Sequence, residues 1–101
     1  MNNLDTLDHI AIQVNSIKDS LHWYLKKFQC EEIYSDRTWA LIRFKNINLA
    51  LVSKSEHPPH FAVLDRAISM CPDTSKHRDG SISKYIQDNS NNYIELINYE
   101  L

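Results

Sequence analysis

Apolar and polar residues alternate near the start of the chain and then recur at helical spacing. Over residues 7–14 the apolar side chains Ile10, Ile12 and Val14 share one parity, which predicts a strand with one apolar face. Apolar residues then recur every three or four positions over residues 17–28, which predicts an amphipathic helix. Ser16 is a suitable N-cap for this helix.

Three further strands are predicted after the helix, over residues 30–35, 38–45 and 47–53. The first two are joined at Asp36-Arg37 and the last two at Asn46, which are residue types common in turns. The first half of the chain therefore reads as one strand, one helix and three strands.

The pattern starts again after a polar linker over residues 54–59, which contains two prolines. His60-Phe61-Ala62-Val63 repeats His9-Ile10-Ala11-Ile12 in residue type and parity. Later, residues 93–97 repeat the pattern of residues 48–52. Both repeats occur in the same order in each half, so the sequence indicates an imperfect duplication.

The second half contains the same elements in shorter form. Asp65 can cap a helix over residues 66–71, and Pro72 ends it after about two turns. Residues 73–80 are expected to form a loop. Two strands follow over residues 81–88 and 93–98, with an asparagine-rich turn between them.

Composition narrows the possible functions. The chain has 101 residues, which is enough for one domain, and 43% of them are hydrophobic. Eleven basic and 13 acidic residues give a net charge of −2, so we expect no nucleic acid partner. No apolar run approaches the roughly 18 residues of a membrane span, and the first five residues lack the features of a signal peptide.

The numbers of glycine and cysteine residues narrow the possible functions further. The single glycine excludes a glycine-rich phosphate-binding loop. Cys30 and Cys71 lie 41 residues apart and form no CxxC motif. We therefore expect a reduced, cytoplasmic protein rather than a disulfide framework.

Three polar residues sit on strand faces opposite the apolar ones. His9 and His60 begin the first strand of each half, and Glu95 lies in the middle of the last strand. Two imidazoles and one carboxylate on one surface can bind a divalent metal and leave positions open for substrate. A single histidine at a strand start is more often a surface or capping residue, so the hypothesis depends on all three together.

Further residues are candidates for substrate contact or for solvent exposure. Ser83 and Tyr85 share a strand face by parity and could line a cleft. Arg43 would favour an anionic substrate if it faced that cleft, although a surface arginine is the commoner case. His22 on the helix and His77 in the polar loop are expected to be solvated.

The ordered set of segments resembles the vicinal oxygen chelate superfamily, which includes glyoxalase I, extradiol dioxygenases, fosfomycin-resistance enzymes and bleomycin-resistance proteins. The segments that carry the resemblance are Leu7–Ile12, the Ser16–Phe28 helix with Trp23-Tyr24, His60–Val63, Arg78-Asp79-Gly80, Tyr85-Ile86 and Asn92–Leu96. The resemblance covers nearly the whole chain.

This resemblance implies an α+β fold in which two βαβββ-like modules form a curled mixed sheet with a cleft. The chain would be a single domain, residues 1–101, with one module at about residues 5–54 and a second at about 60–101. The helix of the second module would be the shortened one.

The resemblance also assigns His9, His60 and Glu95 to three metal ligands, for Ni, Mn, Fe or Zn. Ala50 occupies the position at which many glyoxalase and epimerase relatives carry a fourth ligand. Ser83 and Tyr85 match positions that contact the phosphonate in fosfomycin-resistance transferases. Ala11 replaces the threonine of those enzymes, so fosfomycin transfer itself is not expected, and the sequence identifies no general acid or base.

We therefore expect a metal-dependent enzyme in which a Lewis-acidic ion activates a small substrate bound through adjacent oxygens. One alternative is a non-catalytic protein that sequesters a small molecule, as bleomycin-resistance proteins do. Another is a remnant of the fold that serves as an interaction module. We also expect a homodimer, because the short second helix leaves apolar residues such as Phe61 and Val63 uncovered.

Overall fold

The computed structural model describes residues 3–77 and 80–99. The Arg78-Asp79 pair of the resemblance lies outside the described residues. By their contacts the residues divide into two compact units. The first unit comprises residues 9–60, and the second comprises residues 1–8 together with residues 61–101. Within the described ranges, no helix is long and apolar enough to cross a membrane.

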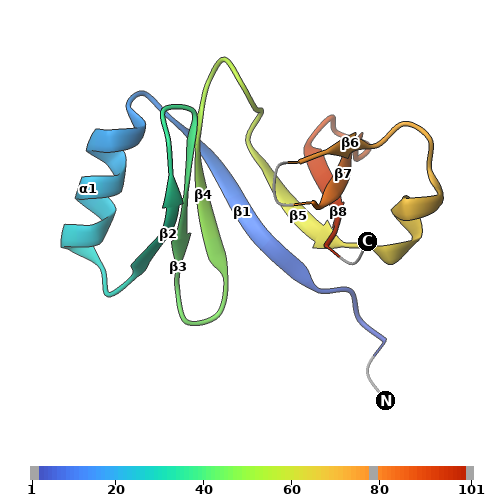
Figure 1. Cartoon of the computed structure of the whole chain (residues 1–101), viewed down its shortest axis with the longest axis horizontal. Helices are drawn as coiled ribbons and strands as arrows, with labels where there is room; N and C mark the ends of the chain where they lie inside the picture. Colours follow the sequence, from blue (N-terminus) through green and yellow to red (C-terminus); the bar gives the residue numbers. More distant parts are fainter. Residues whose placement is uncertain (1–2, 78–79, 100–101) are drawn as a thin grey trace. The chain divides into compact units, whose positions relative to one another are not determined.

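The first unit is a four-stranded sheet with one helix against it (Figure 1). Its strands lie in the order β2-β3-β4-β1. β1 and β4 are parallel, and the other neighbours are antiparallel. The elements are β1 (Leu7–Val14, which begins in the second unit), α1 (Ile17–Lys27), β2 (Glu31–Ser35), β3 (Trp39–Arg43) and β4 (Asn48–Ser53).

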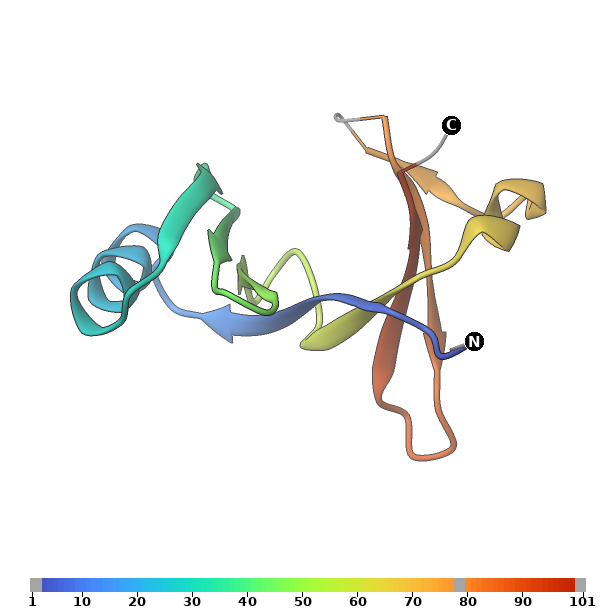
Figure 2. The same cartoon turned by 90° about the horizontal axis from the view of Figure 1, so that it is seen from below.

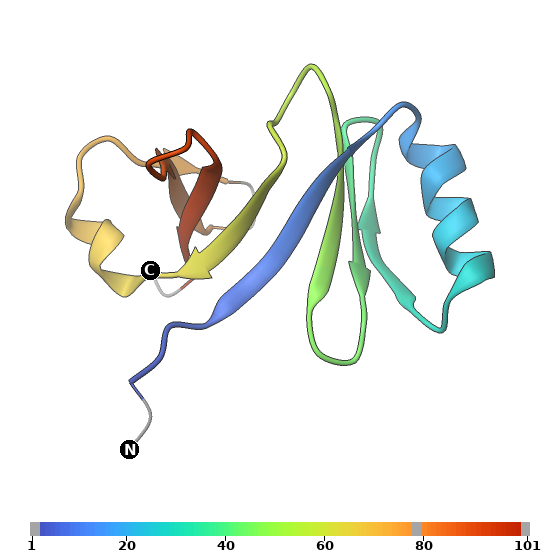
Figure 3. The same ribbon diagram turned by 180° about the vertical axis from the view of Figure 1, so that it is seen from behind.

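Helix α1 begins where the sequence predicts, because the Ser16 hydroxyl accepts a hydrogen bond from the Asp19 backbone N–H. It packs along the sheet of the first unit (Figure 3). The buried side chains at this contact are Ile17, Leu21, Ala40, Ile42 and Leu51. Leu25 and Phe28 share the predicted apolar stripe but are 37% and 45% exposed. The stripe is therefore buried only over the first turns of the helix.

The opposite face of this sheet is lined by small apolar residues. Ala11 of β1, Ala50 of β4 and Leu41 of β3 lie side by side in register. Ala11, Ala50 and Val52 are each at most 3% exposed, with Trp39 and Leu41 packed against them. The alternation along β1 and β4 therefore separates a helix-covered face from an alanine-rich face. Ile12 and Val14, from the apolar face predicted for the first strand, pack on the helix-covered side.

The second unit repeats this arrangement. Its strands lie in the order β5-β8-β7-β6, which is the counterpart of β1-β4-β3-β2 in the first unit. Together the two orders confirm the predicted α+β fold of two βαβββ-like modules. The elements are β5 (His60–Leu64, whose first residue belongs to the first unit), η1 (Arg66–Met70), β6 (Ser75–Lys76), β7 (Ile82–Gln87) and β8 (Tyr93–Asn98).

Strands β7 and β8 form an antiparallel hairpin in the second unit (Figure 2). The Asp88 carboxylate accepts hydrogen bonds from the backbone N–H groups of Ser90 and Asn92. Asn91 adopts a positive φ of 67°, a conformation that asparagine tolerates better than most residues. The asparagine-rich segment therefore forms the turn that the sequence predicts.

Two elements of the second unit differ from expectation. The predicted helix after Asp65 is a 3-10 helix of five residues, η1, with Ile68 as its buried residue. The segment 73–80, expected to be a loop, contains strand β6, which pairs with β7. Ser75 and Lys76 are polar and form only two pairs, so no apolar alternation marks this strand in the sequence.

Candidate functional site

The two histidines at the strand starts lie together in the first unit. His9 is half-buried and His60 is 9% exposed. Their ring centroids are 5.6 Å apart, with an angle of 76° between the ring planes. A ring nitrogen of His9 lies within 4.8 Å of a ring nitrogen of His60. Two histidines at equivalent positions of the predicted repeat are therefore close together in this unit.

The orientation of the His60 ring is fixed by the linker that precedes it. Its Nδ1 lies 2.8 Å from the carbonyl oxygen of Pro58. Because a carbonyl can only accept, Nδ1 carries the proton and Nε2 of the neutral ring carries the lone pair. Metal-binding histidines are commonly oriented by such a contact on their other nitrogen.

Glu95 lies in the middle of β8 in the second unit and is 6% exposed. Tyr85 lies directly opposite it on β7. Burial of the phenol, and then the nearby Glu95 charge, raise the pKa of Tyr85 above its ordinary value. The Tyr85 hydroxyl therefore stays protonated at neutral pH and can donate a hydrogen bond.

Ser83 and His77 form a contact that the sequence does not indicate. Ser83 is 2% exposed, and its hydroxyl shares a hydrogen bond of 2.7 Å with Nε2 of His77. The same nitrogen lies 3.8 Å from a carboxylate oxygen of Glu95. His77 lies in a connection, as expected, but it is not fully solvated: its side chain is 38% exposed, and the unforeseen strand β6 leads it to this face of the second unit.

Ala50 occupies the place in β4 that Glu95 occupies in β8. It is 3% exposed and lies in register with Ala11 and Leu41. A methyl group can neither bind a metal nor accept a proton. The first unit therefore supplies apolar surface at this position instead of a fourth ligand.

Arg43 lies at the end of β3, and its side chain is 62% exposed. Its guanidinium is 3.8 Å from the carboxylate of Glu31, its cross-strand neighbour on β2. An ion pair this exposed holds its partners weakly. Of the remaining histidines, His22 is exposed on α1, as expected.

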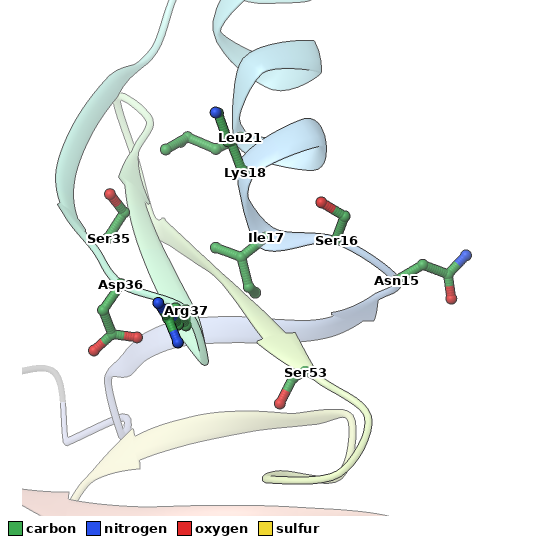
Figure 4. A pocket seen from close by; sticks show the side chains of 9 residues that line it. All are labelled: Asn15, Ser16, Ile17, Lys18, Leu21, Ser35, Asp36, Arg37 and Ser53. Carbon is green, nitrogen blue, oxygen red and sulfur yellow. The ribbon is translucent and has the colours of Figure 1, made fainter.

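A hollow of about 530 Å³ lies elsewhere in the first unit, at the start of α1. Figure 4 shows it between the first turn of the helix and the β2–β3 connection. The six residues that define these two sides are Ser16, Ile17, Lys18, Ser35, Asp36 and Arg37. None of the predicted site residues lines it, so it plays no part in the candidate site.

The protein resembles known proteins in its structure but not in its sequence. No family model and no curated protein matches the sequence. A crystal structure of a hypothetical protein from Bacillus halodurans C-125 has a TM-score of 0.75 and 15% identity, over 96% of each chain. A glyoxalase/bleomycin resistance protein/dioxygenase superfamily member from Vibrio splendidus 12B01 has a TM-score of 0.66 and 8% identity, over 94% of this chain and 99% of that one.

At these identities the likeness concerns the fold and does not extend to activity or ligands. It agrees with the strand orders of the two units and with the resemblance found in the sequence. The chain therefore has the fold of the glyoxalase/bleomycin resistance protein/dioxygenase superfamily, the vicinal oxygen chelate fold.

Proposed function

We propose that this protein is a metal-dependent enzyme in which His9, His60 and Glu95 hold one divalent ion. Its substrate is a small molecule that binds the ion through two adjacent oxygens. The observation that supports this most is the proximity of His9 and His60, whose ring nitrogens lie within 4.8 Å of each other. Imidazole is a ligand that divalent transition metals prefer, and here two imidazoles from different strands lie close together.

The donor types fit such an ion. The contact between His60 and the Pro58 carbonyl favours the tautomer with a lone pair on Nε2. Glu95 is a carboxylate with little solvent exposure, and burying such a charge is costly unless a cation or hydrogen-bond donors compensate it. No thiolate belongs to the set, so Ni, Mn, Fe and Zn all remain compatible.

When bound, the ion supplies a Lewis acid that stabilises negative charge developing on a substrate oxygen. The protein's own residues bind and orient the substrate. The protonated Tyr85 hydroxyl donates a hydrogen bond to a substrate oxygen, and Ser83 contributes a second polar contact. Arg43 binds an anionic group on the substrate, because its exposed ion pair with Glu31 is easily exchanged.

A bidentate oxygen ligand tests this function without knowledge of the natural substrate. Acetohydroxamate binds metals through two adjacent oxygens, so we expect it to bind protein loaded with Ni²⁺ and not protein treated with EDTA. Isothermal titration calorimetry measures both. Wild-type protein that binds Ni²⁺ but shows no difference in acetohydroxamate binding would contradict the proposed mode of substrate binding.

A second candidate function is sequestration of a small hydrophobic molecule without catalysis. It is favoured by the alanine-rich face of the first unit, where Ala50 replaces a polar ligand and Trp39 and Leu41 border the alanines. Such a protein would bind a small apolar dye, 8-anilinonaphthalene-1-sulfonate, in the presence of EDTA, with a rise in the fluorescence of the dye. The metalloenzyme requires the ion for binding, so the EDTA condition separates the two functions.

A further inference from the structure

His77 reaches the candidate site from outside the long strands. It follows β6, and its backbone N–H donates a 2.8 Å hydrogen bond to the carbonyl of Ser81. The N–H of Gly80 donates in turn to the His77 carbonyl at 3.1 Å. Gly80 has a φ of 90°, which strongly favours glycine. The chain's single glycine is thus used at the connection that holds His77 in place.

The side chain of His77 contacts two buried polar groups of the same unit. Its Nε2 is 2.7 Å from the hydroxyl of Ser83 and 3.8 Å from the carboxylate of Glu95. Ser83 and Glu95 lie on adjacent antiparallel strands, in pairs that are two positions apart in the register, and therefore on one face. The carboxylate is therefore bordered by Tyr85 opposite it and by the His77–Ser83 pair beside it.

A carboxylate that binds a metal well must be held in one orientation before the ion arrives. Partners that contact a metal ligand without touching the metal supply this constraint, and their loss typically weakens metal binding about 10-fold to 100-fold. The hydrogen bond between His77 and Ser83 fixes the Ser83 hydroxyl, which otherwise rotates freely. The imidazole also lies beside the Glu95 side chain, with Nε2 at 3.8 Å from a carboxylate oxygen.

We propose that His77 is a positioning residue that, together with Ser83, holds the Glu95 carboxylate in the orientation in which it binds a divalent ion. This inference rests on the proposed metal site. His77 is not one of the three proposed metal ligands, and the sequence pattern gives it no role. The inference assigns it one.

Calorimetric titration of tag-free protein with Ni²⁺ tests the proposal. We expect His77→Ala and Ser83→Ala each to raise the dissociation constant about 10-fold to 100-fold. His77→Gln keeps a side-chain amide that can donate to or accept from Ser83 near the position of Nε2, so its dissociation constant should stay within about threefold of wild type. His22→Ala, which removes an exposed histidine from α1, is the matched control and should bind like wild type.

The absorption spectrum of the Co²⁺-loaded protein separates positioning from direct ligation. His77→Ala should keep the wild-type spectrum, because no ligand is lost. A changed spectrum would mean that His77 binds the metal, and an unchanged Ni²⁺ affinity would mean that it does not position Glu95; either result overturns the proposal. Wild-type protein that binds no Ni²⁺ would instead refute the proposed function itself.

If His77→Ala does not fold, the other two variants decide. Ser83→Ala must still weaken Ni²⁺ binding about 10-fold or more, and His77→Gln must still bind like wild type. Melting temperatures of the metal-free variants show whether each is folded. Wild-type affinity in Ser83→Ala, or a large loss in His77→Gln, would overturn the proposal.

Discussion

At the scale of single residues, the protein buries polar side chains that contribute little to an apolar core. His60 and Glu95 are each less than a tenth exposed. Burying an imidazole or a carboxylate costs free energy unless partners satisfy it. The structure provides some of these partners, such as the Pro58 carbonyl for His60 and the residues around Glu95. Such an arrangement is typical of a site that is kept for its chemistry.

We expect His60→Ala to abolish tight binding of divalent metal while leaving the protein folded. The variant loses one imidazole ligand and the hydrogen bond to Pro58, which should lower the free energy of unfolding by about 1–2 kcal/mol. Metal binding is measured by calorimetry and stability by urea unfolding, with His22→Ala as the control. Undiminished metal affinity in His60→Ala would contradict the assignment of His60 as a ligand.

The candidate residues differ in how far the sequence could identify them. Strand parity and the repeat indicated His9, His60 and Glu95, because each lies opposite apolar neighbours in the chain. His77 could not be found in this way. Its contact with Ser83 depends on the pairing of Ser75 with Ser83. A polar strand of two residues has no hydrophobic pattern from which this pairing could be predicted.

At the scale of elements, the boundaries follow local signals where these are strong. Strand β8 has the predicted bounds, and α1 begins after Ser16 as predicted. The helix after Asp65 could be predicted only as short, because Pro72 limits its length but does not determine its geometry. Five residues with one buried apolar side chain form a 3-10 helix instead.

The connection between β2 and β3 depends on one carboxylate. Asp36 accepts hydrogen bonds from the Tyr34 hydroxyl and from the backbone N–H groups of Thr38 and Trp39. The Tyr34 hydroxyl above all, and then the Thr38 N–H, hold the pKa of Asp36 well below its ordinary value. The ionised carboxylate therefore stabilises this turn.

We expect Asp36→Asn to lower the free energy of unfolding by about 1 kcal/mol at pH 7. Because the pKa of Asp36 is lowered by folding, its contribution is complete above the unfolded-state value of about 4 and is lost as the pH falls below it. Urea unfolding of both proteins at pH 7 and in increasingly acidic buffer measures the difference. A difference that stays constant, or grows, toward acidic pH would contradict this account.

At the scale of the whole molecule, the two modules differ in how well they are covered. Helix α1 spans eleven residues against the first sheet, whereas η1 spans five in the second unit. Of the two residues expected to be uncovered, Phe61 is 36% exposed, whereas Val63 on the same strand face is half-buried. Met70 of η1 is 87% exposed. Exposed apolar side chains that lie close together commonly mark an interface with a partner.

We therefore predict a homodimer whose interface covers the second unit. Sedimentation at micromolar concentration should give a dimer for wild type and a monomer for Phe61→Glu, because a charge in an apolar interface opposes association. Ile33→Glu, at a similarly exposed apolar position of the first unit, is the control and should remain dimeric. A monomeric wild type would contradict the prediction.

Elemental analysis of protein purified without a histidine tag tests the central claim most directly. The account predicts one divalent ion per chain, or, for protein that has lost its metal during purification, a higher melting temperature on addition of Ni²⁺, Mn²⁺, Zn²⁺ or Fe²⁺. Protein that contains no metal and melts at the same temperature with each of these ions would contradict it.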